Sequence, residues 1–379
     1  MNEQVKIFLE NIKTKAEIEV LCNYLSTKAT TFSDPQANGV IYELELSLTK
    51  YFKKKYAVVM NSGTSAINSA YFAMNFEPGD EILVPAYCFY SAISPLHFFG
   101  IKAIAVPISH RTLNIDFSLI NKFITNRSKA ILSTSMTGLI PDQEEISKIS
   151  NNYNIKVIED FSRAYTSSKN STLIGDVSCF SMQDSKALSA IEGGILLTDS
   201  IEIYERAIAY SQPGRIAKSI TSDYLKAYLE GGIGQKYRIN TLGALLAISG
   251  VQSLEDKVKL SNINYERFQK MISKYSYLSP IESYNSPRGA WKDGYAKIIS
   301  SNQNIMARIC SLSNKKGIPI TQEYRDNWVP NIHLRNKITK NLDTSLRIFN
   351  SILVFNGICS YTKDNTIILQ LFEEIFKEV

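Results

Sequence analysis

Lys186 and Asp160 are the residues of this chain whose types and spacing most directly suggest chemistry. Lys186 follows the polar stretch 181–185 and precedes the run Glu-Gly-Gly at 192–194. Asp160 comes just after the short apolar run 155–158, which is typical of a strand. Taken singly, each charged side chain is more often solvated than functional, so their interpretation depends on the residues around them.

An amine, a carboxylate and a hydroxyl in this order are the set that a pyridoxal phosphate site needs. The amine of Lys186 forms a Schiff base with an aldehyde, and the carboxylate of Asp160 holds a pyridine nitrogen protonated. The hydroxyl of Ser181, five residues before Lys186, is placed to reach the phosphate of the same cofactor. The alternative for Ser181 is a polar residue on a half-buried strand.

A second candidate element is the turn Ser62-Gly63-Thr64-Ser65, which follows the strand-like run 56–60 and opens a helix-like segment. Small residues let the backbone approach an anion, and the first N–H groups of a helix lack intrahelical acceptors. Gly63 and Thr64, with Ser65 as a third candidate, are therefore predicted to bind the phosphate. The alternative is that Ser62 or Thr64 only caps the helix. The turn is neither a Walker loop nor a dinucleotide fingerprint, so neither ATP nor NAD is indicated.

Phe89 is the aromatic candidate, and it follows the strand-like run 81–85. A ring at the end of a strand can stack on a planar cofactor. A core aromatic is an equally good interpretation of Phe89 from these residues alone.

The elements that must position these residues alternate between strand-like and helix-like patterns over residues 40–200. This alternation predicts an α/β fold whose central sheet is mostly parallel and sandwiched by helices. The expected strands are 56–60, 81–85, 101–106, 130–133, 155–158 and 194–198.

A long helix pattern at 254–275 leads from this region into a less regular one. We therefore expect two domains, as the length of 379 residues also suggests. Residues 1–254 are predicted to form a large cofactor-binding domain with an N-terminal helical segment. Residues 255–379 are predicted to form a small α+β domain, with strands near 295–299, 318–322 and 366–370.

The composition excludes several functional classes. A hydrophobic content of 44% and a charged content of 21% are ordinary for a soluble globular enzyme. The net charge of +6 is spread without a basic block, which argues against a nucleic-acid partner. Five scattered cysteines and three isolated histidines argue against a metal site and for reduced thiols in the cytoplasm. The chain has no signal-peptide core and no apolar run of ~20 residues, so no membrane association is expected.

The chain resembles the DegT/StrS-type sugar aminotransferases, which are pyridoxal phosphate enzymes of the aspartate aminotransferase fold (fold type I). The resemblance covers roughly residues 35–255, and it rests on the order and spacing of the motifs together. The matching segments are 61–66, 78–82, 84–85 with Phe89, 114–116, 157–160, 175–176, 179–181 with Lys186, 192–194, and 234–238 followed by Ala244 and Gln252.

The resemblance implies a role for each candidate residue. Lys186 would be the Schiff-base lysine, Asp160 the partner of the pyridinium nitrogen, and Phe89 the ring that stacks on the cofactor. The residues that would hold the phosphate are Gly63, Thr64 and Ser181.

The resemblance also implies a homodimer whose two sites lie at the interface. The loop that carries Lys236 and Arg238 would then reach the cofactor of the partner subunit, where two cations suit a phosphate. The chain departs from the family pattern at three positions. Arg163 stands where the family often has Gln or His near the cofactor's hydroxyl, Lys236 where Asn is common, and Ser135 where His is common.

The implied activity is the transfer of an amino group from glutamate or glutamine to a keto sugar, and a nucleotide-linked keto sugar is the expected substrate. Such a step belongs to the biosynthesis of surface polysaccharides or secondary metabolites. One alternative is a pyridoxal phosphate-dependent sugar dehydratase of the same fold, although those enzymes carry His in place of the lysine, so Lys186 argues against it. The other alternative is a non-catalytic binding or regulatory relative, which Arg163 and Lys236 keep open.

Overall fold

The computed structural model describes eight segments of the chain and a few single helical positions near its ends. The segments are 34–168, 173–215, 222–230, 234–282, 288–299, 304–322, 351–360 and 364–379. The single positions are Glu19, Cys22, Asn23, Leu25, Ser26 and Ile348.

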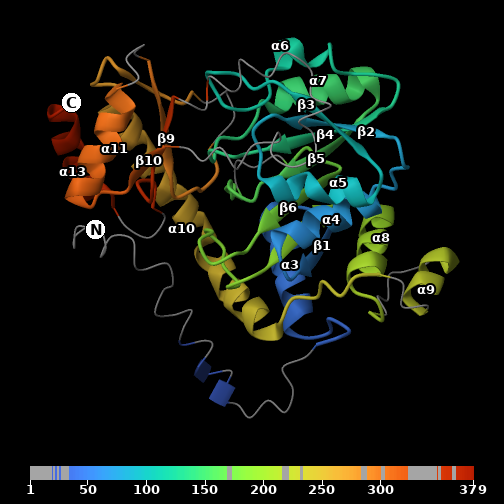
Figure 1. Ribbon diagram of the computed structural model, residues 1–379. Coiled ribbons are helices and arrows are strands. Elements are labelled where there is room, and N and C mark those ends of the chain that lie inside the picture. The colour runs from blue at the N-terminus through green and yellow to red at the C-terminus, as the bar shows by residue number, and fades with distance from the viewer. Residues whose placement is uncertain are drawn as a thin grey trace.

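A seven-stranded sheet forms the centre of the larger region (Figure 1), with the strand order β1-β7-β6-β5-β4-β2-β3. Neighbouring strands from β3 to β6 are parallel, and β7 is antiparallel to both β6 and β1. The expected mostly parallel sheet is therefore confirmed, with β6 as a strand that the pattern of expected strands omitted. The strands are β1 (Tyr56–Met60), β2 (Glu81–Pro85), β3 (Lys102–Val106), β4 (Ser128–Thr134), β5 (Lys156–Asp160), β6 (Val177–Ser181) and β7 (Gly194–Thr198).

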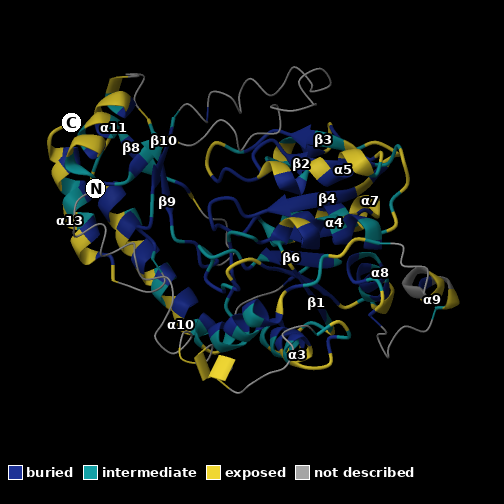
Figure 2. Ribbon diagram, turned by 60° about the horizontal axis from the view of Figure 1, so that its bottom comes forward, coloured by how far each residue is buried: buried dark blue, intermediate teal, exposed yellow. Residues whose placement is uncertain are grey.

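Helices cover both faces of this sheet. Successive residues of β1 point to opposite faces of the sheet. Val58 packs in the hydrophobic cluster that includes α4 and α8, whereas Val59 packs in the cluster that includes α3. Figure 2 shows the strands buried, as expected for a sheet with two covered faces. The helices here are α3 (Val40–Phe52), α4 (Gly63–Ala73), α5 (Ser94–Phe98), α6 (Phe117–Ile120), α7 (Gln143–Tyr153), α8 (Ile201–Ser211) and α9 (Asp223–Glu230), with the short 3₁₀ helix η1 (Tyr90–Ala92).

The helix α10 (Thr241–Ile272) connects the large sheet to a smaller one. Its first part packs on α3, and its last part contacts the antiparallel sheet β10-β11-β9-β8. This second region has the expected α+β character. The predicted boundary between residues 254 and 255 falls inside α10, so that division into domains stays a prediction. The remaining elements are β8 (Leu278–Pro280), β9 (Gly294–Ile298), β10 (Ile320–Gln322), β11 (Ile352–Phe355), α11 (Asn304–Lys316) and α13 (Thr366–Lys377).

The strand expected near 366–370 is wrong, because these residues form the first turns of α13. The apolar start of this segment suits a strand, but its buried residues Ile368, Phe372, Ile375 and Phe376 recur at helical spacing. The expected pattern lacked β11, one of the two interior strands of the small sheet, and the edge strand β8. Within the described segments, none of the helices combines the length and the apolar character needed to cross a bilayer.

Candidate active site

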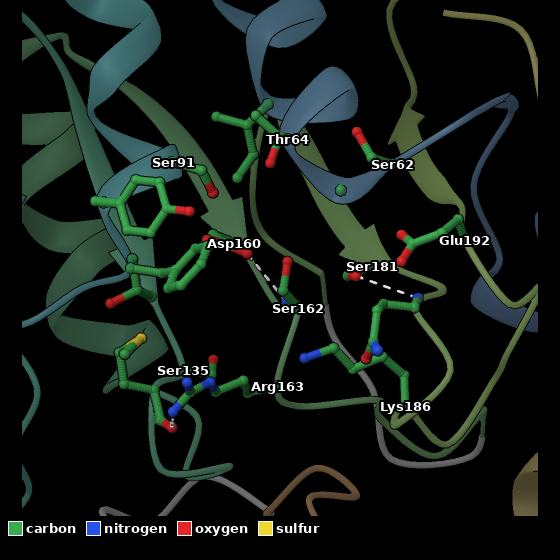
Figure 3. Close-up of a pocket in the computed structure, with 17 residues that line it drawn as sticks. Ser62, Thr64, Ser91, Ser135, Asp160, Ser162, Arg163, Ser181, Lys186 and Glu192 are labelled. Carbon is green, nitrogen blue, oxygen red and sulfur yellow. Dashed lines mark hydrogen bonds between the residues drawn. The ribbon is translucent and has the colours of Figure 1, made fainter. Parts of the chain in front are cut away.

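A cavity of about 480 Å³ opens at the carboxyl ends of the parallel strands, next to the first turn of α4 (Figure 3). The crevice beyond the carboxyl ends of such strands is the usual ligand site of an open α/β sheet. Loops after β1, β2, β4, β5 and β6 all contribute to its walls. The cavity brings together seven of the predicted site residues, namely Gly63, Thr64, Phe89, Asp160, Arg163, Ser181 and Lys186.

The first turn of α4 forms one wall of the cavity. Ser62 is the N-cap, and its hydroxyl accepts a hydrogen bond from the N–H of Ser65 at 3.1 Å. The capping role considered for Ser62 is therefore present, while Gly63 and Thr64 face the cavity at the helix start. The backbone N–H groups in the first turn of a helix lack intrahelical acceptors, and together with the helix dipole they form a favourable site for an anion. Ser65 does not line the cavity, because its hydroxyl donates to Asn61 Oδ1 at 2.6 Å.

Asp160 lies at the end of β5, at the base of the cavity. One carboxylate oxygen accepts a hydrogen bond from the N–H of Ser162 at 3.0 Å. Burial raises the pKa of Asp160, and the hydrogen bonds from Ser162 act against that rise. The positive charges of Lys186 and Arg163 also favour the ionised carboxylate. The site therefore holds a buried carboxylate that is supported by nearby cations.

Lys186 extends from the loop after β6 toward Asp160 (Figure 3). The pKa of Lys186 is lowered to about 7, first by burial and next by the positive charge of Arg163, whereas Asp160 opposes the change. A lysine that loses its proton near neutral pH can act as a nucleophile or a base. This combination of burial, a charge partner and a cavity is typical of functional sites.

Phe89 lines the cavity from the loop after β2, just before η1. It remains 38% exposed, so the alternative of a core aromatic does not hold. Its ring centroid lies 4.4 Å from that of Tyr90, which also lines the cavity. Its stacking on a cofactor stays a prediction.

Ser135 and Arg163 are two of the positions at which the chain departs from the family pattern, and both line the cavity. The hydroxyl of Ser135 is buried and has no hydrogen-bond partner among the described residues. The N–H of Ser135 donates a hydrogen bond to the backbone oxygen of Asp160 at 3.2 Å, so Ser135 lies next to the end of β5. A buried polar group without a partner costs ~1–3 kcal/mol, so such a group at a cavity points to a ligand.

Trp291 and Tyr295 are neighbours of the site that the sequence reasoning missed. Trp291 is 4% exposed, and both the Arg163 guanidinium and the Lys186 amine lie over its ring. The hydroxyl of Tyr295, on β9, accepts a hydrogen bond from Arg163 at 3.2 Å. These two residues belong to the small sheet region, far from Lys186 in sequence, and no local motif marks them.

Lys236 and Arg238 do not line the cavity. Lys236 is exposed, and Arg238 pairs with Met60 in an isolated β-bridge. The loop is held to the large sheet by a hydrogen bond from the N–H of Asn61 to the oxygen of Tyr237 at 2.6 Å. Residues 231–233, just before this loop, lie outside the described residues. The expected reach of Lys236 and Arg238 into a partner subunit stays a prediction.

Among the described residues, no group of three or more His, Cys, Asp or Glu side chains could hold a metal ion. The charged groups at the cavity are instead an isolated amine, a guanidinium and carboxylates. The amine and the guanidinium are groups that can interact with an anionic ligand.

The fold is the mixed α/β fold of aspartate aminotransferase-like enzymes, and comparison with known proteins identifies the family. Residues 33–353 match the model of the DegT/DnrJ/EryC1/StrS aminotransferase family, and the chain belongs to it. The predicted resemblance is thereby confirmed.

Three relatives show the level of similarity. GDP-perosamine synthase of Caulobacter vibrioides is 27% identical over 57% of this chain and 57% of its own length. UDP-2-acetamido-2-deoxy-3-oxo-D-glucuronate aminotransferase of Pseudomonas aeruginosa is 29% identical over 62% of both chains. GDP-4-keto-6-deoxy-D-mannose 3-dehydratase of Yersinia pseudotuberculosis is 32% identical over 43% of this chain and 44% of its own. The matches to the first two thus span about three fifths of the relatives' length.

Solved structures agree over nearly the whole chain. The GDP-4-keto-6-deoxy-D-mannose-3-dehydratase of E. coli, solved with hydrated PLP, aligns with a TM-score of 0.84 at 22% identity and covers 97% of both chains. An aminotransferase from Psychrobacter cryohalolentis aligns with a TM-score of 0.82 at 20% identity and covers 97% of this chain and 98% of its own. These structures confirm the predicted fold.

Proposed function

We propose that this chain is a pyridoxal phosphate-dependent aminotransferase that moves an amino group from glutamate or glutamine to a keto sugar linked to a nucleotide. The observation that carries the proposal is the Lys186 amine, with its lowered pKa, in one cavity with Asp160 and the start of α4. Membership of an aminotransferase family supports it, as do two relatives named for nucleotide-sugar products or substrates.

The residues at the cavity fit pyridoxal phosphate. The start of α4 suits its phosphate, with Gly63, Thr64 and the hydroxyl of Ser181 as the groups that would hold it. Asp160 is the acceptor suited to the pyridine nitrogen, and Phe89 is the ring suited to stacking. The unpartnered hydroxyl of Ser135 is a further polar group available to a ligand.

When bound, pyridoxal phosphate supplies an aldehyde that can carry the amino group and a ring that accepts electron density. The protein's part is to position groups and to move protons. Nζ of Lys186 is the base and acid that takes a proton from the reacting carbon and returns it, which its pKa of about 7 allows at neutral pH. The buried carboxylate of Asp160 would stabilise positive charge at the ring nitrogen.

A sugar dehydratase of the same fold is the second candidate, because a dehydratase relative and dehydratase structures are among the similar proteins. Lys186 argues against it, since the dehydratases carry His at the lysine position. A non-catalytic relative is the third candidate, and a site able to bind the cofactor without turnover would support it.

We also propose a homodimer with shared sites, in which Lys236 and Arg238 reach the partner's cofactor phosphate. The exposure of Lys236 leaves it available to a second subunit. The test mixes a Lys186→Ala chain with a Lys236→Ala chain, each inactive alone. Heterodimers with one intact site should regain part of the activity. No recovery in demonstrated heterodimers would contradict the shared site.

The proposed setting is the cytoplasm, in the synthesis of amino sugars for surface polysaccharides or secondary metabolites, without a nucleic-acid or membrane partner. The free state of all five cysteines supports a reducing compartment.

The experiment that tests the activity is a screen of nucleotide-linked keto sugars with glutamate or glutamine, read by mass spectrometry. An aminotransferase yields an amino sugar and a keto acid in equal amounts. Bound pyridoxal phosphate would make the protein yellow, and this colour should bleach when the amino donor is added. A sugar that loses water without gaining nitrogen would favour the dehydratase. A yellow protein that turns over none of these sugars would favour the non-catalytic candidate.

A further inference from the structure

Arg163 and Lys186 share one aromatic ring. The guanidinium carbon of Arg163 lies 4.9 Å from the centroid of the Trp291 ring, and Nζ of Lys186 lies 4.7 Å from the same ring. Because Trp291 is almost fully buried, the ring offers both cations a neighbour of low polarity. Two positive groups thus contact one buried ring, and like charges in buried surroundings are poorly screened.

Arg163 is fixed in this position from both parts of the fold. Its Nη1 donates to the oxygen of Met136 at 3.3 Å, in the loop after β4, and to the hydroxyl of Tyr295 at 3.2 Å, on β9. Nε1 of Trp291 donates to the same Tyr295 hydroxyl at 3.3 Å. Figure 3 shows Arg163 beside Ser135, in the same cavity that Lys186 lines. The guanidinium is therefore a built feature of the site.

The two cations differ in their ability to respond. An arginine keeps its charge at any pH that proteins tolerate, whereas a lysine can lose its proton. Repulsion between the two cations can therefore be relieved when Lys186 loses its proton. Burial is the largest cause of the lowered pKa of Lys186, and Arg163 is the next.

Other charged groups also act on Lys186. Asp160 and Asp293 favour the charged amine, whereas Lys292 disfavours it. Glu192 also lines the cavity. The cations Arg163 and Lys292 thus oppose the carboxylates, and Arg163 is the one that shares the ring with Lys186.

We propose that Arg163 is a positioning residue that, held by Trp291 and Tyr295, keeps a permanent charge beside Lys186 and so favours the uncharged, nucleophilic form of its amine. Arg163 is one of the positions at which the chain departs from the family pattern, where Gln or His is common. The value of a neutral Lys186 for catalysis rests on the proposed function, but the effect on its protonation does not. The charge widens the pH range in which the amine can react, toward the acid side.

The test measures the protonation of Lys186 directly in the full-length protein, freed of any aldehyde ligand with hydroxylamine and dialysis. Trace acetylation with acetic anhydride between about pH 5.5 and 10.5 labels only uncharged amines, because the charged form is not a nucleophile. Mass spectrometry of the peptide that carries Lys186 gives the midpoint, with the exposed Lys102 as the internal reference. The variants are Arg163→Gln, Arg163→Met and the charge-conserving control Arg163→Lys, each checked for folding by circular dichroism.

We expect a wild-type midpoint near pH 7. Both neutral variants should raise it by ~1 unit, which lowers labelling at pH 7 about fivefold. Arg163→Lys should stay closer to the wild type. Unchanged midpoints in the neutral variants, or an equal shift in Arg163→Lys, would overturn the proposal.

Two further readouts keep the test decisive. If the neutral variants fail to fold, a wild-type midpoint at the ordinary lysine value of ~10.4 still overturns the proposal. Failure to bind pyridoxal phosphate with the midpoints shifted as expected would instead overturn the proposed function alone, because the labelling needs no cofactor.

Discussion

Gly63 packs directly against Ser181, so the start of α4 lies on the end of β6. A Cβ atom added at Gly63 would lie 2.8 Å from Cβ of Ser181, closer than side chains normally approach. This contact brings the two proposed phosphate-binding elements, the helix start and the Ser181 hydroxyl, to one wall of the cavity. Gly63 is thus required for close approach and not for an unusual backbone angle.

The change Gly63→Ala should push α4 away from β6 and weaken cofactor binding. Overpacking of this kind costs ~1–3 kcal/mol, so a fall in the melting temperature is also expected. Fluorescence titration with pyridoxal phosphate measures the affinity. Gly39→Ala is the matched control, because its added Cβ would meet only an ordinary contact of 3.5 Å with Asp34. Equal affinities in the two variants would show that the contact does not shape the phosphate site.

The change Lys186→Ala should abolish transamination and the covalent attachment of pyridoxal phosphate, while the fold survives. Lys186 lines the cavity on a loop, so its truncation removes no core packing. Borohydride reduction followed by peptide mapping locates the attached cofactor in the wild type. A variant that stays fully active and still retains the label after reduction rules out Lys186 as the reacting amine.

The change Asp160→Asn is nearly isosteric and should leave the fold intact. It removes the negative charge that supports the ring nitrogen, so turnover should fall by ~100-fold or more. Steady-state kinetics measure this fall. Asp116→Asn is the control, because Asp116 caps α6 far from the cavity and Asn caps a helix equally well. Turnover at the level of this control would exclude Asp160 from the ring nitrogen.

The lowered pKa of Lys186 also predicts a pH dependence of stability. Between pH 7 and ~10.4 the unfolded chain holds a proton on this amine that the folded chain has lost. The unfolded state then binds more protons, so this residue makes stability rise with pH across that window. Lys186→Met should lack this rise, because it has no proton to bind. Urea titrations of both proteins at pH 7 and pH 9.5 measure the difference, and parallel changes in the two would contradict the lowered pKa.

Local patterns determined much of this protein. The turn at Gly63, the alternation of strands and helices, and the short interval from Ser181 to Lys186 are all readable because neighbours in sequence share one backbone geometry. The residues that follow β1, β5 and β6 can therefore be predicted to form one site, because the carboxyl ends of parallel strands lie at the same edge of the sheet.

Only the tertiary structure decided which distant residues complete the site. Tyr295 lies on β9 of the small sheet and Trp291 in the segment just before it, so their contacts with Arg163 and Lys186 depend on how that region packs on the large sheet. The apolar segment 366–370 forms the start of the helix α13. The buried face of α13 packs in the hydrophobic core that also contains residues of α10 and the small sheet. Such outcomes follow from long-range packing, which overrides local propensity and leaves no mark in the spacing of neighbouring residues.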